Sequence, residues 1–254
     1  MNQDIFSLNN KTILITGASS GIGRQTAIDC SHRGANLILL GRRKEELEKT
    51  HNLLSKGNHS LFVCDITTYG SLEAVISKGV EYSGKIYGFV HCAGIEATVP
   101  INNMRPENYD MFYSANVISA FEIVKIISKK KYLSPEGTSI VLISSIMGLL
   151  GQPGKTAYCS SKGALISGCK ALALELAYKG IRVNCILPAI VQTEMTNELF
   201  KNLSDESVNA IIKMHPLGLG SPEDVSNACI FLLSKASRWI TGSNLIVDGG
   251  YSAQ

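Results

Sequence analysis

The first apolar run of the chain leads directly into Thr16-Gly17-Ala18-Ser19-Ser20-Gly21-Ile22-Gly23, a turn that contains three glycines. Glycine permits a tight turn and lets the backbone approach a ligand closely. Apolar and small residues then recur at helical spacing, so the turn opens a helix whose free N–H groups favour an anion such as a pyrophosphate. A glycine-rich turn without a ligand is the alternative, but its position between a first strand and a first helix favours a nucleotide site.

Strand-like and helix-like stretches alternate along the chain. The apolar runs are rich in Ile, Leu and Val with little polar alternation, which is typical of parallel strands buried on both faces. These runs are 12–16, 36–40, 60–64, 86–91, 139–144, 181–187 and 244–247. The helix-like stretches lie near 22–33, 44–56, 71–82, 107–131, 156–179 and 222–234. The pattern predicts an α/β fold, a Rossmann-type doubly wound parallel sheet of about seven strands with helices on both faces.

No repeat or linker interrupts this alternation, so we expect a single domain over residues 1–254. The long connection 188–221 is irregular and is predicted to contain one or two short helices. Long insertions of this kind usually carry substrate loops or lids, so we expect a substrate loop at about 188–221.

Composition excludes several classes of protein. With 45% apolar and 18% charged residues, the chain is neither disordered, nor collagen-like, nor a coiled coil. The net charge of +3 gives no support for a nucleic-acid partner. Seven cysteines without a C-x-x-C spacing argue against a disulfide framework and against a metal site. The first residues show no basic segment followed by an apolar run, so we expect no signal peptide. No apolar stretch reaches roughly 18 residues, so we expect a cytoplasmic protein without a membrane partner.

Two arginines, Arg42 and Arg43, follow the second strand, where a site for NAD would place a carboxylate. A guanidinium pair suits the 2′-phosphate of NADP(H) instead, although the pair could also simply solvate the start of a helix. Asp65 ends the third strand, where it either accepts a hydrogen bond from an adenine amino group or caps a turn.

Tyr158 and Lys162 are four residues apart in a helical stretch, so they share one face of the helix. Such a pair arises easily by chance, and its meaning comes from its chemistry. An ammonium group beside a phenol lowers the pKa of the phenol, which makes Tyr158 a candidate acid or base. Ser145 follows the fifth strand, where its hydroxyl either contacts a substrate carbonyl or contributes ordinary turn polarity.

At these residues the chain resembles the short-chain dehydrogenase/reductase family, in its single-domain branch. The matches occur in family order and extend over nearly the whole chain. They are TGASSGIG at 16–23, Asp65-Ile66, Ala93-Gly94, Asn116, Ser145, Tyr158 with Lys162, Pro188 with Thr193, and ITGSNLIVDGG at 240–250. A P-loop is disfavoured, because the full G-x-x-x-x-G-K-[ST] motif does not occur: Gly154-Lys155-Thr156 is present, but Leu149 stands at the position of the first glycine.

The resemblance implies a catalytic tetrad of Asn116, Ser145, Tyr158 and Lys162. Tyr158 would donate a proton to a carbonyl oxygen that Ser145 hydrogen-bonds, while Lys162 would bind the nicotinamide ribose and Asn116 would hold a relay water. A structural role inside a helix is the alternative for Asn116. The expected cofactor contacts are Gly17, Ser19, Ser20, Gly21, Ile22, Gly23, Arg42, Arg43, Asp65, Ile66, Cys92, Ala93, Gly94, Tyr158, Lys162, Pro188, Val191 and Thr193.

Two positions depart from the family pattern. The family usually has Asn-Asn-Ala-Gly after the fourth strand, whereas this chain has His91-Cys92-Ala93-Gly94, and the loss of the second amide predicts altered bracing or weaker cofactor binding. A metal role for His91 with Cys92 is disfavoured, because adjacent residues on a strand point to opposite faces. Ala189 follows Pro188 where Gly is usual, which would be costly if the backbone there had a positive φ.

The resemblance implies an NADPH-dependent carbonyl reductase, with NAD(H) as a possible cofactor, that assembles as a homotetramer. Within the family the chain is most similar to 3-oxoacyl-[acyl-carrier-protein] reductases. Reductases of sugars, steroids or small ketones are the alternative, and a non-catalytic nucleotide-sensing or scaffold protein is the alternative from another class. If the substrate is carrier-linked, basic residues such as Lys129–Lys131 and Lys179 are expected near the active-site mouth. The alternative, which the sequence alone favours, is that these lysines solvate helix C-termini, where the dipole favours them.

Overall fold

The structure is a computed structural model that describes residues 4–201 and 203–253. Within these ranges one sheet contains β1 (Thr12–Thr16), β2 (Asn36–Gly41), β3 (His59–Val63), β4 (Ile86–His91), β5 (Thr138–Ile143), β6 (Ile181–Pro188) and β7 (Asn244–Val247). All neighbouring strands are parallel, in the order β3-β2-β1-β4-β5-β6-β7. The predicted doubly wound sheet is confirmed, and no strand differs from its predicted run by more than one residue at either end.

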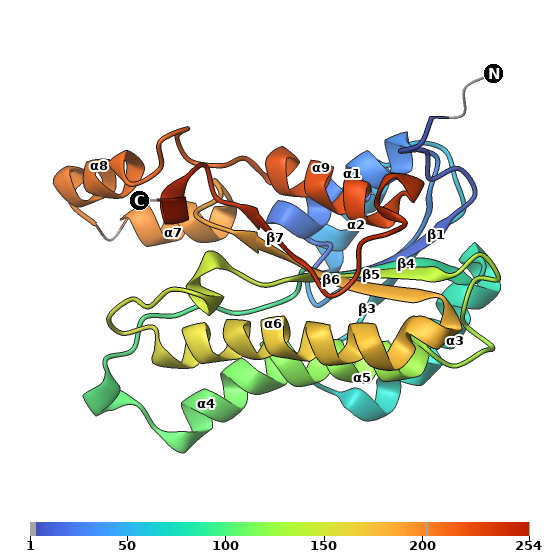
Figure 1. The fold of residues 1–254 in the computed structure, drawn as a ribbon, viewed down its shortest axis with the longest axis horizontal. Coiled ribbons are helices and arrows are strands. Elements are labelled where there is room, and N and C mark those ends of the chain that lie inside the picture. Colours follow the sequence, from blue (N-terminus) through green and yellow to red (C-terminus); the bar gives the residue numbers. More distant parts are fainter. Residues whose placement is uncertain (1–3, 202, 254) are drawn as a thin grey trace.

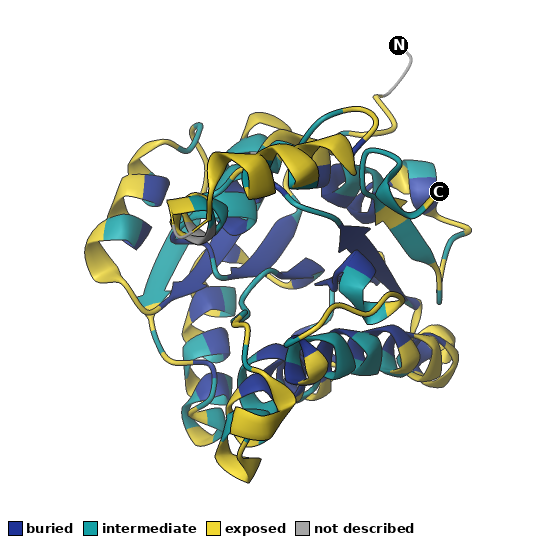
Figure 2. Cartoon of the chain, turned by 90° about the vertical axis from the view of Figure 1, so that its left-hand side faces the viewer, coloured by how far each residue is buried: buried dark blue, intermediate teal, exposed yellow. Residues whose placement is uncertain are grey.

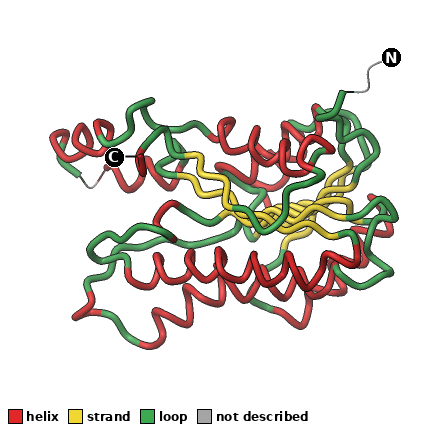
Figure 3. The backbone as a smooth tube through the Cα atoms, in the orientation of Figure 1, coloured by secondary structure: helices red, strands yellow, loops and turns green. Residues whose placement is uncertain are grey.

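Helices cover both faces of the sheet. They are α1 (Gly21–His32), α2 (Lys44–Asn52), α3 (Tyr69–Ser83), α4 (Pro106–Tyr113), α5 (Ser119–Ile127), α6 (Thr156–Leu176), α7 (Glu194–Lys201), α8 (Asp205–Lys213) and α9 (Pro222–Leu233). In Figure 1, α1, α2 and α9 lie above the sheet and α3 to α6 lie below it. The strands form the middle of three layers in Figure 3.

The period of the strands explains why both faces are filled. Ile13 and Ile15 of β1 belong to a core that α1, α2 and α9 complete, whereas Leu14 belongs to a second core with α3, α5 and α6. Successive side chains of a strand point to opposite faces, so a strand without polar residues requires an apolar partner on each side. All five residues of β1 and all six of β5 are buried, as this arrangement requires.

The predicted helix 107–131 is not continuous, which corrects the sequence-based expectation. A π-helical turn over Ser114–Ile118 separates α4 from α5, and Asn116 lies inside it. A π-turn is a wider turn that often occurs at functional sites, and apolar periodicity alone does not distinguish it from an α-helix. Helix α2 also ends at Asn52, earlier than the predicted end near residue 56.

The carboxyl ends of the strands share one edge, and the loops that follow them gather there. Figure 2 looks onto this edge, with buried strands in the middle and less buried loops and short helices around them. The segment 188–221 lies here and contains α7 and α8, as predicted. Its two ends are joined, because the Gln192 amide donates to the Gly220 carbonyl at 2.8 Å and the Gly220 amide donates to the Ile190 carbonyl at 3.1 Å.

Close backbone packing shapes the glycine-rich turn. Gly17 has a φ of 67°, and a Cβ on it would lie 2.8 Å from the Ala93 nitrogen at the end of β4. A Cβ on Gly23 would lie 2.3 Å from the Gly17 carbonyl oxygen, which is shorter than any real contact. Glycine at both positions therefore lets α1 begin immediately beside β1 and β4.

The residues at 23 and 70 provide a test of this packing. Gly23→Ala should lower the free energy of unfolding by about 1–3 kcal/mol, because the added methyl group meets a backbone carbonyl that has no room to move. Gly70→Ala, in α3 with nothing within 4 Å of its Cβ position, should leave stability unchanged or raise it. Urea unfolding of both variants measures the difference, and equal stability of the two would contradict the packing argument.

Candidate active site

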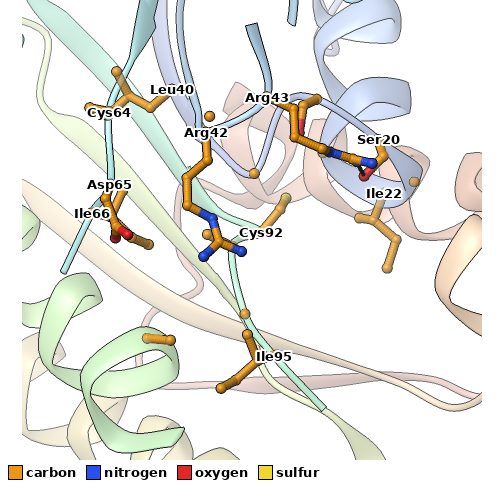
Figure 4. Close-up of a pocket in the computed structure, with 18 of the residues that line it drawn as sticks. Ser20, Ile22, Leu40, Arg42, Arg43, Cys64, Asp65, Ile66, Cys92 and Ile95 are labelled. Carbon is orange, nitrogen blue, oxygen red and sulfur yellow. Dashed lines mark hydrogen bonds between the residues drawn. The ribbon is translucent and has the colours of Figure 1, made fainter. Parts of the chain in front are cut away.

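A cavity of about 340 Å³ opens at the carboxyl edge of the sheet, between the ends of β1, β2, β3 and β4. Its walls include these predicted cofactor residues: Gly17, Ser19, Ser20, Gly21, Ile22, Gly23, Arg42, Arg43, Asp65, Ile66, Cys92, Ala93, Gly94 and Thr193. Several further residues line the cavity and were not predicted from the sequence: Leu40, Gly41, Cys64, Thr67, Ile95, Ala115 and Glu194. Figure 4 shows many of these side chains around the cavity. The structure therefore brings fourteen of the predicted cofactor residues to one place.

The N-terminus of α1 forms the anion-binding side of this cavity. Ser20 precedes the helix without a side-chain cap, and the first turn carries no acidic residue. The first N–H groups of the helix thus lack side-chain acceptors, and the dipole favours a negative group there. The absence of Cβ atoms at Gly17 and Gly23 leaves the backbone close to the cavity, so the turn fits a dinucleotide pyrophosphate.

The two arginines after β2 point in different directions. In Figure 4 the Arg42 guanidinium reaches into the cavity, whereas Arg43 turns toward Ser20. Arg43 donates to the Ser20 hydroxyl at 2.6 Å and pairs with Glu194 at 3.5 Å. No ion pair of Arg42 occurs within residues 4–201 and 203–253. Of the two side chains, Arg42 is the one available to a ligand.

Asp65 caps a turn, which was one of its two predicted roles. One carboxylate oxygen accepts the Thr67 amide at 2.9 Å and the Thr67 hydroxyl at 2.7 Å. These hydrogen bonds are the main reason that the pKa of Asp65 is lowered, with a small contribution from Arg42. Its carboxylate also lines the cavity, so the second role is compatible with the first.

Ser145 and Tyr158 meet beside the cavity. Ser145 follows β5 and begins a short 3₁₀ turn, where its hydroxyl accepts the Met147 amide at 3.1 Å and contacts the Pro188 carbonyl at 3.5 Å. A hydrogen bond from Ser145 to the Tyr158 phenol favours the phenolate, but burial of the phenol has the larger effect and raises the pKa of Tyr158. Tyr158 is therefore protonated at neutral pH.

Lys162 lies one helical turn after Tyr158 and is 6% exposed. Its Nζ donates to the Ile143 carbonyl at 2.9 Å and lies 5.8 Å from the centre of the Tyr158 ring. Burial lowers the pKa of Lys162 to about 8. A lowered pKa of Tyr158 was predicted, but the pKa is raised, because burial of the phenol has the largest effect and the Lys162 ammonium points to a backbone carbonyl.

Asn116 is fully buried and holds the loop after β4. Its side-chain amide accepts the Ile95 amide at 2.8 Å, and donates to the Ile95 carbonyl at 3.1 Å and to Ser161 at 2.9 Å. A Cβ on Gly94 would lie 3.0 Å from the Asn116 Oδ1 and 3.5 Å from the Lys162 Nζ, so both side chains converge there. Asn116 thus has the predicted structural contacts and also lies next to Lys162.

His91 supplies bracing that the sequence analysis did not foresee. Its Nδ1 lies 3.0 Å from the Thr16 hydroxyl, which also accepts the Ala93 amide at 3.3 Å. The ends of β1 and β4 are joined in this way although Cys92 replaces the usual amide. Burial lowers the pKa of His91 to about 3, so the ring is neutral. Within the described ranges, no cluster of three potential metal ligands occurs.

From the start of the segment 188–221, Thr193 lines the cavity, whereas the predicted cofactor residues Pro188 and Val191 do not. Pro188 ends β6, Val191 is bridged to Gly220, and a Cβ on Gly21 would lie 3.2 Å from the Thr193 methyl group. The concern about Ala189 is not supported, because Asn10 is the only non-glycine residue with a positive φ in the part of the chain that the structure describes.

The basic residues proposed for the active-site mouth lie elsewhere in the chain. Lys129 and Lys131 pair with Glu73, and Lys179 donates to the Ser128 carbonyl at 3.3 Å. This cluster lies beside the amino ends of the strands, because the Tyr132 carbonyl accepts the amide of Ile86, the first residue of β4. Helix α6 places Lys179 about 30 Å from Tyr158. The expectation that these lysines lie near the active-site mouth of their own chain is therefore wrong. They lie at or just after helix C-termini, which was the alternative.

The fold and the cavity together define a nucleotide-binding α/β protein. Comparisons with known proteins show which family it belongs to. A family model described as "Enoyl-(Acyl carrier protein) reductase" matches residues 17–252. The 3-oxoacyl-[acyl-carrier-protein] reductase FabG of Rickettsia bellii is 36% identical over 97% of this chain and 98% of its own length. The FabG of Thermotoga maritima is 33% identical, over 96% and 98% respectively.

A crystal structure from Sinorhizobium meliloti, assigned as a short-chain alcohol dehydrogenase, superposes with a TM-score of 0.93. It is 29% identical and covers 99% of this chain and 100% of its own. The chain belongs to the short-chain dehydrogenase/reductase family. It is an NAD(P)-dependent oxidoreductase that acts on CH–OH groups.

Buried Lys162 makes stability depend on pH in a predictable way. Its pKa is lowered to about 8 from an ordinary 10.5, so below pH 8 the folded state carries a buried charge that costs about 3 kcal/mol. Between those two pH values only the unfolded state binds the proton, and wild-type stability rises. Lys162→Met removes the charge but leaves the Ile143 carbonyl without its donor, which offsets part of the gain.

We therefore expect the stability of Lys162→Met relative to wild type to be highest at pH 7 and to fall by about 3 kcal/mol as the pH rises to 10.5. Denaturant unfolding of both proteins across this pH range measures the difference. A stability difference that is independent of pH would show that Lys162 does not titrate as its burial requires.

Proposed function

We propose that this protein is a 3-oxoacyl-[acyl-carrier-protein] reductase that uses NADPH to reduce a carbonyl to a hydroxyl. The observation that carries this proposal is the arrangement of Ser145, Tyr158 and Lys162 close to a cavity that the side chain of Arg42 enters. The relatives from Rickettsia bellii and Thermotoga maritima support the choice of substrate. Both relatives are named for that reaction, and each aligns with this chain over almost its full length.

The cofactor fits the residues that surround the cavity. The N-terminus of α1 with Ser19 to Gly23 would hold the pyrophosphate, and Arg42 with Arg43 would bind the 2′-phosphate. Asp65 and Ile66 would contact the adenine, and Cys92 to Gly94 the adjacent ribose. Pro188, Val191 and Thr193 would receive the nicotinamide end, with Lys162 on its ribose. When bound, the nicotinamide supplies the hydride.

The proton chemistry belongs to Tyr158 and its neighbours. Because burial raises its pKa, Tyr158 holds its proton at neutral pH and donates it to the carbonyl oxygen of the substrate. Ser145, in hydrogen-bond contact with the phenol, would share that oxygen and stabilise the negative charge that develops on it. Lys162 stabilises the phenolate that remains, and Asn116, which converges with it at Gly94, would hold the water that returns the proton.

Other assignments make different demands on the site. A reductase of sugars, steroids or small ketones would use the same four residues, and the alcohol dehydrogenase assignment of the Sinorhizobium meliloti protein favours that alternative. NAD(H) as the cofactor would require little from Arg42. A nucleotide-sensing or scaffold protein would not need Tyr158 and Lys162 together. Assays with NADPH and an acetoacetyl thioester, a crotonyl thioester or a free ketone separate these possibilities. The crotonyl thioester tests reduction of a carbon–carbon double bond. Brisk reduction of a simple ketone, without reduction of the acetoacetyl thioester, would overturn the assignment.

Several sequence-based predictions accompany this proposal. We propose one domain over residues 1–254, with the segment 188–221 as its substrate loop. No helix in the described part of the chain is long and apolar enough to cross a bilayer, and the cytoplasmic setting stays a prediction. A homotetramer also stays a prediction. The exposed side chains of Leu174 in α6, of Tyr178 in the 3₁₀ turn that follows α6, and of Trp239 support an assembly.

Tyr158→Phe removes the phenol oxygen and keeps the ring. Loss of a general acid typically lowers the rate by about 10²–10⁴, so kcat for acetoacetyl thioester reduction should fall by this factor. The affinity for NADPH should stay within about twofold of wild type, because the hydroxyl contributes mainly to the reacting end of the site. Steady-state kinetics and fluorescence titration measure the two quantities. Wild-type turnover by the variant would remove Tyr158 from the mechanism.

Arg42→Ala should weaken NADPH far more than NADH, because only NADPH carries the 2′-phosphate that the free guanidinium can bind. A hydrogen bond to a charged group contributes about 1.5–3 kcal/mol, so we expect the preference for NADPH to fall by about 10- to 150-fold. Titration of both cofactors against both proteins measures this ratio. A wild-type protein that prefers NADH would contradict the role given to Arg42.

A further inference from the structure

Glu194, the first residue of α7, places a carboxylate in the wall of the cofactor cavity. It lies 3.5 Å from an Arg43 guanidinium nitrogen and 3.8 Å from one of Arg24. Arg24 belongs to α1, and Arg43 is the residue that precedes α2. The Glu194 carboxylate is therefore a negative charge beside two arginines that would also attract an anionic ligand.

The two arginines are held by other contacts, whereas Glu194 is not held tightly by them. Arg24 pairs with Glu46 and donates to the Ser19 carbonyl, both at 2.5 Å, and Arg43 donates to Ser20 at 2.6 Å. The side chain of Glu194 is 55% exposed, and its ion pairs are longer than these contacts. Exposed ion pairs of this kind stabilise by at most about 1 kcal/mol, so a stronger anion can displace the carboxylate.

A phosphate group is such an anion. At neutral pH it carries up to two charges and three acceptor oxygens, and arginine binds it with well-matched geometry. The carboxylate already occupies one side of Arg43, and Arg42 is the guanidinium in the cavity that has no ion pair in the described part of the chain. A 2′-phosphate bound between Ser20, Arg42 and Arg43 would compete with Glu194 for Arg43 and would be repelled by it.

We propose that Glu194 is a specificity-determining residue that competes with the 2′-phosphate of the cofactor for Arg43. The inference rests on the proposed function, because it requires a bound adenine dinucleotide. Competition reduces the preference for NADPH over NADH. It also links the cofactor to the segment 188–221, because displacement of the carboxylate releases the contact that holds the start of α7 to α1 and α2.

The test uses two ligands that differ only in the 2′-phosphate: adenosine 2′,5′-bisphosphate and adenosine 5′-monophosphate. Glu194→Gln keeps the shape of the side chain and removes its charge. The Kd of the bisphosphate should fall by about three- to tenfold, and that of the monophosphate should change by less than about twofold. Calorimetric titration of the full chain gives both constants. The gain should shrink at high salt, because the competition is electrostatic.

Two further proteins serve as controls. Glu206→Gln removes an exposed charge from the first turn of α8, in the same segment, and should leave both constants unchanged. In an Arg43→Ala background, the gain from Glu194→Gln should be smaller, because the shared partner is gone and only the direct repulsion remains. An unchanged or weaker bisphosphate affinity in Glu194→Gln overturns the proposal. So does an equal gain for both ligands, or a gain of the same size without Arg43.

The same titrations with NADPH and NADH distinguish this proposal from the proposed function. If the wild-type protein binds neither cofactor, the proposed function itself is wrong. If the wild-type protein binds NADPH and Glu194→Gln leaves its preference over NADH unchanged, only the role of Glu194 is wrong. A preference for NADPH that rises in Glu194→Gln supports both.

Discussion

The backbone contact between Gly23 and the Gly17 carbonyl is the constraint on which the site depends. No side chain fits between α1 and the turn that precedes it, so the helix begins immediately beside the end of β1. The same turn presses against the end of β4 at Ala93. This proximity directs the free N–H groups of α1 into the space between neighbouring strand ends. A longer or bulkier turn would move the helix dipole away from the cavity, and the binding site would lose its main source of positive potential.

Burial, more than pairing of opposite charges, sets the protonation of the reacting groups. Tyr158 is kept neutral and Lys162 is brought to a pKa of about 8 because each has lost its hydration. His91 is neutral for the same reason. The oxidoreductase therefore holds one group that can donate a proton and one ammonium that needs an anion nearby. Formation of a phenolate on Tyr158 would provide that anion, which is how a costly buried charge becomes useful in catalysis.

The parts of the structure that the sequence predicted are those with local signals. Continuous apolar runs identified the strands, because a strand between two layers of helices has no polar face. The glycine-rich turn was recognisable for a similar reason, since its residue types answer a local steric demand. Arg42 and Arg43 could be placed at the cavity because they directly follow a strand end.

The remaining features depend on long-range packing. The Thr16–His91 contact joins two strands far apart in the sequence, and the π-turn around Asn116 leaves the apolar period of its helix almost unchanged. Lys179 was wrongly predicted to lie near the active-site mouth. It follows the C-terminal end of α6, whereas Tyr158 and the site lie at the N-terminal end of that helix. Glu194 had only one signal, an acid at the start of a short helix beside Thr193. Its arginine partners lie about 150 and 170 residues away along the chain.

The paired residues at the two ends of the segment 188–221 have an evolutionary consequence. Because Gln192 and Gly220 are already joined, the chain between them closes on itself before it reaches the sheet. Lengthening such a loop adds only a slowly growing entropy cost, and the strands on either side keep their positions. The segment that we propose as the substrate loop can thus change in length without moving the sheet. Because Thr193 and Glu194 line the cavity, such changes leave the cofactor residues in place only where they fall beyond these two positions.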